Sequence, residues 1–239
     1  MPAGHRREVR LYSAQAACET VAYVTHSAGK PRVSATAGSA GFFGKLPARG
    51  DFVRDGLPGS FVGPWDDWVR RVLVGSQDQL GAGWLPAWME APVWRFALAP
   101  GLCGPAPALG LMLPSVDRAG RYFPLTFATL SAPVLSADEP WDDRGDVAAW
   151  LDRSEAAGVS ALEQGLGPDQ VAALVPAPLP GAGVPADGSL WWTTGAPRVA
   201  ATRLRFATLP DVAGFTRMLS DVQSSHGQLS DGQPAEPSA

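Results

Sequence analysis

The apolar residues of this chain recur with two different spacings, and together they predict about a dozen short elements. After Pro64, large apolar residues recur at intervals of three and four positions, which predicts an amphipathic helix over residues 64–80. The same reading predicts helices over 83–90, 145–164 and 168–175, and a last one around 215–219. Short apolar runs bounded by Gly or Pro predict strands over 41–46, 93–98, 109–113, 123–130, 190–194 and 199–207.

The order of these elements favours an α/β (α+β) fold: a single compact domain with a mixed or mainly antiparallel central sheet flanked by helices. Helices and strands are interspersed, but they do not follow the regular βαβ period that a parallel sheet needs. Residues 175–188 contain four prolines and predict a surface loop. Residues 1–40 carry a net charge of +3 and end in a run of small residues, and residues 222–239 are polar and show no apolar spacing. We therefore expect a domain over residues 41–221, a flexible N-terminal extension over 1–40 and a disordered C-terminal tail over 222–239.

The content of glycine and proline, 27 and 23 of 239 residues, is by itself typical of a disordered chain. However, 46% of the residues are hydrophobic and nine are tryptophans, which is enough apolar surface to build a core. The net charge of −4 gives no overall basic surface for nucleic acid. Residues 96–116 are uncharged and long enough to cross a bilayer, but four prolines interrupt them. We expect a cytoplasmic protein without membrane insertion.

The distribution of histidine and cysteine argues against several kinds of enzyme. All three histidines, His5, His26 and His226, lie in the predicted tails, and the predicted domain has a single cysteine, Cys103. Nucleophilic triads need an imidazole within hydrogen-bond reach, and structural zinc sites need several Cys or His ligands. We therefore expect no metal, no cofactor and no enzymatic activity.

Two short loops concentrate the charged residues that remain. Both pack opposite charges into a Gly/Pro-rich turn between apolar residues, and their candidate functional residues are Lys45, Arg49 and Asp51 in loop 44–52 and Ser115, Asp117, Arg118 and Arg121 in loop 114–124. Their cations could converge on a phosphate or carboxylate. Alternatively, Asp51 and Asp117 form salt bridges with Arg49, Arg95, Arg118 or Arg121 that only fix the loops. General acid–base catalysis by paired carboxylates is a third alternative.

The adjacent tryptophans Trp191 and Trp192 are candidates for an interaction surface. Neighbouring residues of a strand point to opposite faces of the sheet, so at least one of the two could cover the second face or meet a partner. Tryptophan and arginine are the residue types that dominate binding hot spots.

Five separated motifs, in the same order, resemble the TagF (ImpM) family of type VI secretion-associated proteins. They are Gly41-Phe42-Phe43-Gly44-Lys45-Leu46-Pro47 with Gly50-Asp51-Phe52, Phe61-Val62 with Trp65-Asp66-Asp67-Trp68, Ala91-Pro92-Val93-Trp94-Arg95-Phe96, Pro114-Ser115-Val116-Asp117-Arg118-Ala119-Gly120-Arg121-Tyr122-Phe123-Pro124-Leu125-Thr126, and Ser189-Leu190-Trp191-Trp192-Thr193 followed by Leu209-Pro210, Phe215 and Met218-Leu219. The resemblance covers about residues 41–221.

The resemblance implies a cytoplasmic accessory protein that represses type VI secretion after translation, by binding the forkhead-associated (FHA) scaffold protein. It also implies a compact α/β fold. Some relatives carry a PP2C-type phosphatase domain, for which this chain has no room, so phosphatase activity is not expected. Two other functions remain open. One is a small-anion-binding sensor or histidine-independent enzyme that uses loops 44–52 and 114–124, and the other is a structural subunit of the secretion apparatus.

Overall fold

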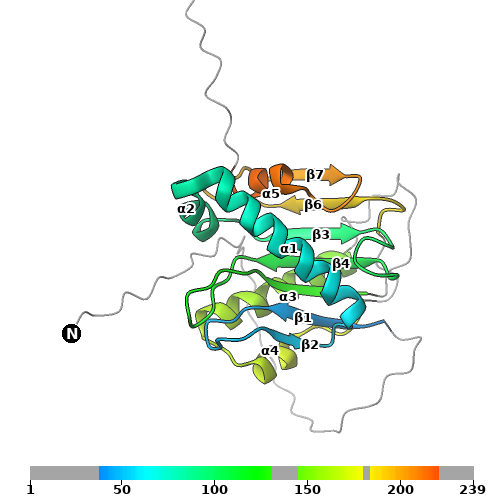
Figure 1. Ribbon diagram of the computed structural model, residues 1–239. Coiled ribbons are helices and arrows are strands. Elements are labelled where there is room, and N and C mark those ends of the chain that lie inside the picture. The colour runs from blue at the N-terminus through cyan, green and yellow to red at the C-terminus, as the bar shows by residue number, and fades with distance from the viewer. Residues whose placement is uncertain (1–37, 131–144, 180–183, 221–239) are drawn as a thin grey trace, which may run out of the picture.

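A computed structural model describes residues 38–130, 145–179 and 184–220 (Figure 1). The predicted N-terminal extension, apart from residues 38–40, and the predicted C-terminal tail lie outside the described residues. Among the described residues, no helix has the combination of length and apolarity that spanning a membrane requires.

One seven-stranded sheet, antiparallel at every strand pair, organises the fold. The predicted α/β class is therefore confirmed, with every pair in the antiparallel arrangement. The strand order across the sheet is β2-β1-β5-β4-β3-β6-β7. The strands are β1 (Ala40–Gly44), β2 (Val53–Asp55), β3 (Trp94–Leu98), β4 (Ala108–Leu113), β5 (Leu125–Thr129), β6 (Ser189–Thr193) and β7 (Thr202–Phe206).

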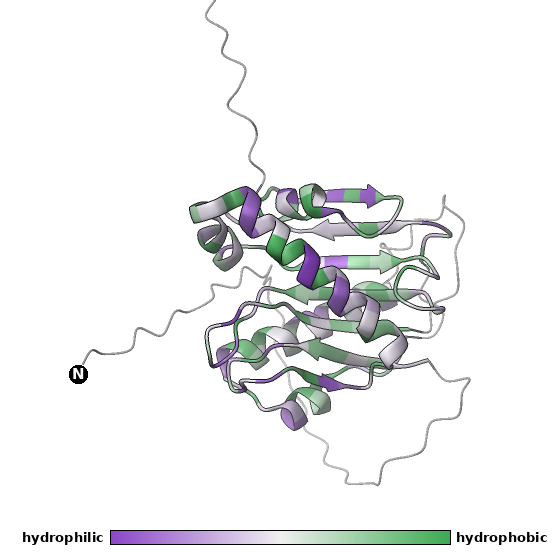
Figure 2. Cartoon of the chain, in the orientation of Figure 1, coloured by the Kyte–Doolittle hydropathy of each residue, from purple (hydrophilic) through white to green (hydrophobic). Residues whose placement is uncertain are grey.

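Helices cover both faces of the sheet (Figure 1). The helices on one face are α1 (Gly59–Leu80), which crosses the sheet diagonally, the short helices η1 (Gly81–Gly83) and α2 (Trp84–Met89), and α5 (Val212–Leu219). The opposite face is covered by α3 (Gly145–Glu163) and α4 (Pro168–Leu174). In Figure 2 the central strands are mainly hydrophobic, whereas β2 and β7, at the two edges, carry strongly hydrophilic residues.

Because both faces are covered, successive residues of a central strand enter two different cores. In β4, Leu109, Leu111 and Leu113 pack against α3, while Ala108 and Met112 pack in the core under α1. Every residue of β4 and β5 is buried. This explains why the sequence shows little polar–apolar alternation there: neither face of these strands meets water.

The structure differs from the predicted boundaries in two places that matter for the site. The short edge strand β2 was not predicted, because its sequence Val-Arg-Asp has no apolar run. Helix α1 begins at Gly59, one turn before Pro64, the residue at which the first-turn preference of proline placed its start. Phe61 and Val62 in that extra turn are buried and extend the apolar face of the helix.

Trp191, one of the two candidates for an interaction surface, is not a surface residue. Its side chain is fully buried, stacks with Trp65 at a centroid distance of 6.1 Å, and donates from Nε1 to Ser189 Oγ at 3.0 Å. Trp192 points to the other face, as expected of neighbours in a strand, and is partly buried against the core beneath α3. The two neighbours therefore pack in different cores, Trp191 under α1 and Trp192 beneath α3, and Trp191 is inaccessible to a partner.

Candidate functional site

The antiparallel pairing of β1 with β5 brings the two predicted loops to the same end of the sheet. Loop 44–52 leaves β1 where loop 114–124 enters β5, because Phe43 pairs with Thr126. Two further hydrogen bonds join the loops. The amide of Arg118 donates to the carbonyl oxygen of Arg49 at 3.0 Å, and Ser115 Oγ donates to the carbonyl oxygen of Lys45 at 2.8 Å. Segments about seventy residues apart in sequence thus form one structural unit.

A buried carboxylate is the centre of this unit. Asp117 Oδ2 accepts from Lys45 Nζ at 2.7 Å and from Arg121 Nε at 2.8 Å. Its Oδ1 accepts from the amides of Ala119 at 2.8 Å and Arg121 at 2.9 Å. Lys45 and Asp117 are only 3% and 4% exposed. Lys45 Nζ also donates to the carbonyl oxygen of Gly50 at 3.3 Å, and Arg121 Nη2 donates to the same oxygen.

The hydrogen bonds decide the protonation state of Asp117. Burial alone raises the pKa of this carboxyl group, since it disfavours the charged form. The bonds from Lys45 and from the backbone and side chain of Arg121 outweigh burial and lower the pKa to about 2. Asp117 is therefore a carboxylate at neutral pH, with its acceptors already occupied, and it is poorly suited to act as a general base.

Glycine permits the close approach of the two loops. Gly44 has a φ of +146°, and a Cβ placed there would lie 2.1 Å from the carbonyl oxygen of Pro124. Ser115, one of the predicted functional residues, is also structural in this geometry. It is fully buried, and its carbonyl oxygen accepts from Trp88 Nε1 at 3.3 Å, which ties the loop to α2.

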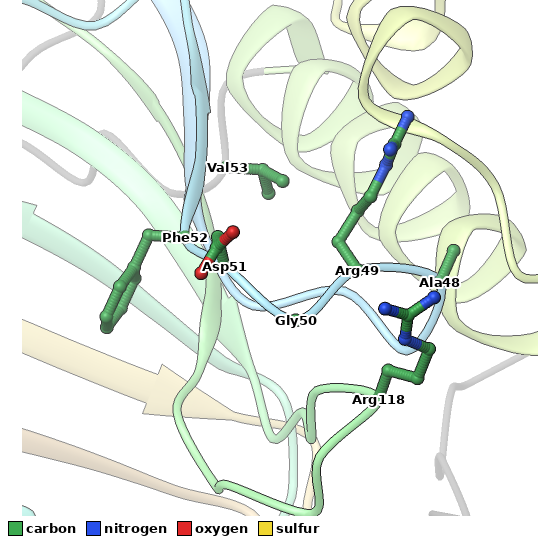
Figure 3. Close-up of a pocket in the computed structure, with 7 residues that line it drawn as sticks. All are labelled: Ala48, Arg49, Gly50, Asp51, Phe52, Val53 and Arg118. Atoms are coloured by element: carbon green, nitrogen blue, oxygen red, sulfur yellow. The ribbon is translucent and has the colours of Figure 1, made fainter.

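The remaining predicted residues line an open pocket of about 300 Å³ (Figure 3). Arg49, Asp51 and Arg118 are exposed, and across the described ranges none of their side chains has a hydrogen bond or an ion pair. Arg49 and Arg118 lie on one side of the pocket and extend in different directions, with Asp51 and Val53 facing them (Figure 3).

The structure therefore divides the four predicted cations into two pairs. Lys45 and Arg121 bind Asp117 and hold the loops together, whereas Arg49 and Arg118 point outward. Arg95, considered as a partner for the loop carboxylates, belongs elsewhere. Its Nη2 donates to Asp152 and Glu155 of α3 at 2.7 Å and 2.8 Å.

Phe52 is the member of this site that the sequence reasoning missed. Its ring stacks on Phe43 at a centroid distance of 5.5 Å and meets Phe123 edge-on at 4.8 Å, yet the residue is 37% exposed. Lys45 Nζ lies 4.3 Å from its ring centroid and the guanidinium carbon of Arg70 lies 5.0 Å from it. An aromatic residue directly after the charged turn Arg49-Gly50-Asp51 was the available signal.

The exposed side chains of the site include those of Arg49, Arg118, Asp51 and Phe52. Within residues 38–130, 145–179 and 184–220, no group of three His, Cys, Asp or Glu side chains is arranged to hold a metal ion.

Comparisons with known proteins agree with the motifs at this site. Residues 41–177 match the family model of the TagF N-terminal domain, described as type VI secretion system-associated. The chain is also similar to the crystal structure of PA0076 from Pseudomonas aeruginosa PAO1, with 36% sequence identity and a TM-score of 0.64. That match covers 83% of this chain and 100% of the other. No curated protein matches the sequence.

Proposed function

Because this chain belongs to the TagF family of type VI secretion-associated proteins, we propose that it represses a type VI secretion system after translation, by binding the FHA-domain scaffold protein. The family match over residues 41–177 carries the proposal. It includes both charged loops, β1 except for its first residue, and all of β2 to β5, the part of the sheet on which the candidate site is built. In this proposal the protein acts in the cytoplasm and has no enzymatic activity.

The geometry of the charged loops fits a binding function better than catalysis. The buried carboxylate Asp117 is held by four hydrogen bonds and is closed off from solvent. The groups that do reach solvent include Arg49, Arg118, Asp51 and part of Phe52, and arginine is among the residue types that contribute most to protein interfaces.

The first experiment tests the cellular role. Deletion of the gene should increase release of the secretion tube protein into the medium, and expression from a plasmid should reverse the increase. The FHA-domain protein should co-purify with the tagged full-length chain from the native host. Unchanged secretion after deletion, in a strain with an active system, would refute repression, and absence of the FHA-domain protein from the purified complex would refute the proposed partner.

A second experiment separates binding from catalysis. A repressor that acts by binding must be present at about the concentration of its target, so secretion should fall gradually as the protein is titrated. Co-expression of extra FHA-domain protein should restore secretion, because it competes for the repressor. An enzyme would repress at far lower concentrations, and added target would have little effect. Quantitative immunoblotting of both proteins alongside tube-protein release distinguishes these outcomes.

Cell fractionation addresses the alternative of a structural subunit. Under our proposal the protein stays in the cytosolic fraction and is recovered from the membrane or baseplate complex only in amounts that depend on the FHA-domain protein. Stoichiometric recovery with the assembled apparatus would instead support a structural role.

A further inference from the structure

An exposed aromatic ring surrounded by arginines stands out on the surface of the two loops. Phe52 shares its pocket with Arg49 and Arg118, its ring lies under the guanidinium of Arg70, and Arg121 donates to the carbonyl oxygen of Gly50 two residues before it. We call these five residues, Phe52, Arg49, Arg70, Arg118 and Arg121, the Phe52–arginine surface.

The ring at the centre of this surface is held in place. Phe43 and Phe123, both buried, contact Phe52 from two directions, and Lys45 fixes a positive charge 4.3 Å from its centroid. An aromatic side chain that is fixed before binding loses little conformational entropy when a partner covers it. The exposed part of Phe52 therefore has the properties of a binding anchor.

The charge of this region is opposite to that of the whole chain. The four arginines and Lys45 are accompanied by three carboxylates, Asp51, Asp66 and Asp117, which leaves a local net charge of +2 on a chain with −4 overall. Two of the carboxylates are engaged, Asp117 by Lys45 and Arg121, and Asp66 by Arg70 at 2.8 Å. Arg49 and Arg118 have no such partner among the described residues, and with Asp51 of the same pocket they contribute +1; Lys45 and Arg121 against the single carboxylate Asp117 contribute the other +1.

We propose that the Phe52–arginine surface is the docking site for a carboxylate-rich segment of the protein partner, with an apolar side chain of that segment placed on Phe52. This inference rests on the proposed function for the existence of a partner. The arrangement favours a segment over a small anion. Arg49 and Arg118 extend in different directions around an open pocket (Figure 3), so one small anion meets one guanidinium, whereas an extended acidic chain meets both.

The test compares two charge reversals of equal size in the full-length protein. Arg49→Glu with Arg118→Glu changes the surface, while Arg153→Glu with Arg217→Glu changes exposed arginines of α3 and α5 and is the matched control. Circular dichroism and thermal unfolding check that all variants are folded. Titration calorimetry measures binding to the purified FHA-domain protein and to a Glu-rich decapeptide, at about 0.1 M and about 1 M salt, where the screening length falls from about 10 Å to about 3 Å.

We expect the Arg49/Arg118 variant to bind the FHA-domain protein at least about tenfold more weakly than the wild type at low salt. The control should change affinity by less than about twofold. High salt should weaken binding by the wild type. It should not weaken binding by the Arg49/Arg118 variant, since the reversed charges repel an acidic segment and salt screens that repulsion. Equal binding by wild type and both variants would overturn the inference while leaving the proposed function intact.

The peptide arm separates the two proposals when the FHA-domain protein does not bind. Peptide binding that requires Arg49 and Arg118 would then support the docking site and refute the proposed partner. No binding to either probe would overturn the docking site as well. Inorganic phosphate that binds at Arg49 and Arg118 while the peptide does not would also overturn it, in favour of a small-anion site.

Discussion

Asp117 is the residue whose replacement tests the structure of the site most directly. Asp117→Asn keeps the size of the side chain and an oxygen for the amides of Ala119 and Arg121, but it removes the charge that pairs with Lys45. The buried ammonium is then left with the carbonyl oxygen of Gly50 at 3.3 Å and the Phe52 ring. Leaving one partner of a buried ion pair uncompensated costs about 3–5 kcal/mol.

The lowered pKa of Asp117 gives the magnitude of one part of this cost. A fall from the ordinary 3.8 to about 2 corresponds to about 2 kcal/mol in favour of the charged form in the folded state. This figure is smaller because it does not include the cost of leaving Lys45 buried without its partner. Arg121 adds little to that cost, since its side chain is 60% exposed and hydrated. We therefore expect Asp117→Asn to lower the free energy of unfolding by about 3 kcal/mol at pH 7.

Urea unfolding followed by tryptophan fluorescence measures this change, with an unchanged m-value showing that both states keep their exposed area. Lys45→Met, which retains most of the apolar stem, completes a double-mutant cycle. The free energy of unfolding lost by the double variant should be about 1–3 kcal/mol smaller than the sum of the losses in the two single variants, because either replacement already breaks the pair. The assignment of a stabilising buried pair would be refuted if Asp117→Asn lowered the free energy of unfolding by less than about 1 kcal/mol, or if the effects of the two single replacements were strictly additive.

Three further predictions follow from the same structure. Because the pKa of Asp117 is lowered to about 2, the stability advantage of the wild type over Asp117→Asn should be complete above about pH 5. Urea unfolding at a series of pH values should show this advantage shrinking as the pH falls through 3.8 towards 2. Gly44→Ala should prevent or severely impair folding, because its Cβ would overlap the Pro124 carbonyl oxygen. Gly120→Ala, at a φ of +82° but with no atom within 4 Å of its Cβ, should lower the free energy of unfolding by only about 1 kcal/mol, measured by thermal unfolding. Trp191→Ala should lower the free energy of unfolding, measured by urea unfolding, by about 3–5 kcal/mol. A decrease below about 1 kcal/mol would contradict the place of Trp191 in the core.

Local patterns were sufficient for most of the helices and strands. The predicted helix over 145–164 corresponds to α3, Gly145–Glu163, and the predicted strand over 93–98 corresponds to β3, Trp94–Leu98. Each depends on neighbours within a few positions, so the spacing of apolar residues records it. The strand β2 escaped prediction because it forms through pairing with β1 and not through its own apolar content.

The candidate site shows where local patterns stop being informative. The sequence placed four cations in the two charged loops, Lys45, Arg49, Arg118 and Arg121, but it did not indicate which of them are buried and which are exposed. Which cation is buried depends on the pairing of β1 with β5, because that pairing places Lys45 beside an aspartate 72 positions away.

By itself, then, the sequence determined the family, the fold class and the two loops, because motifs and apolar spacing are properties of short stretches of chain. Tertiary structure alone decided that Lys45 pairs with Asp117, that Arg49 and Arg118 reach solvent, and that Trp191 lies in the core. Burial and ion pairing depend on which distant segments become neighbours. The order of strands in the sheet sets those neighbours, and no local pattern encodes it.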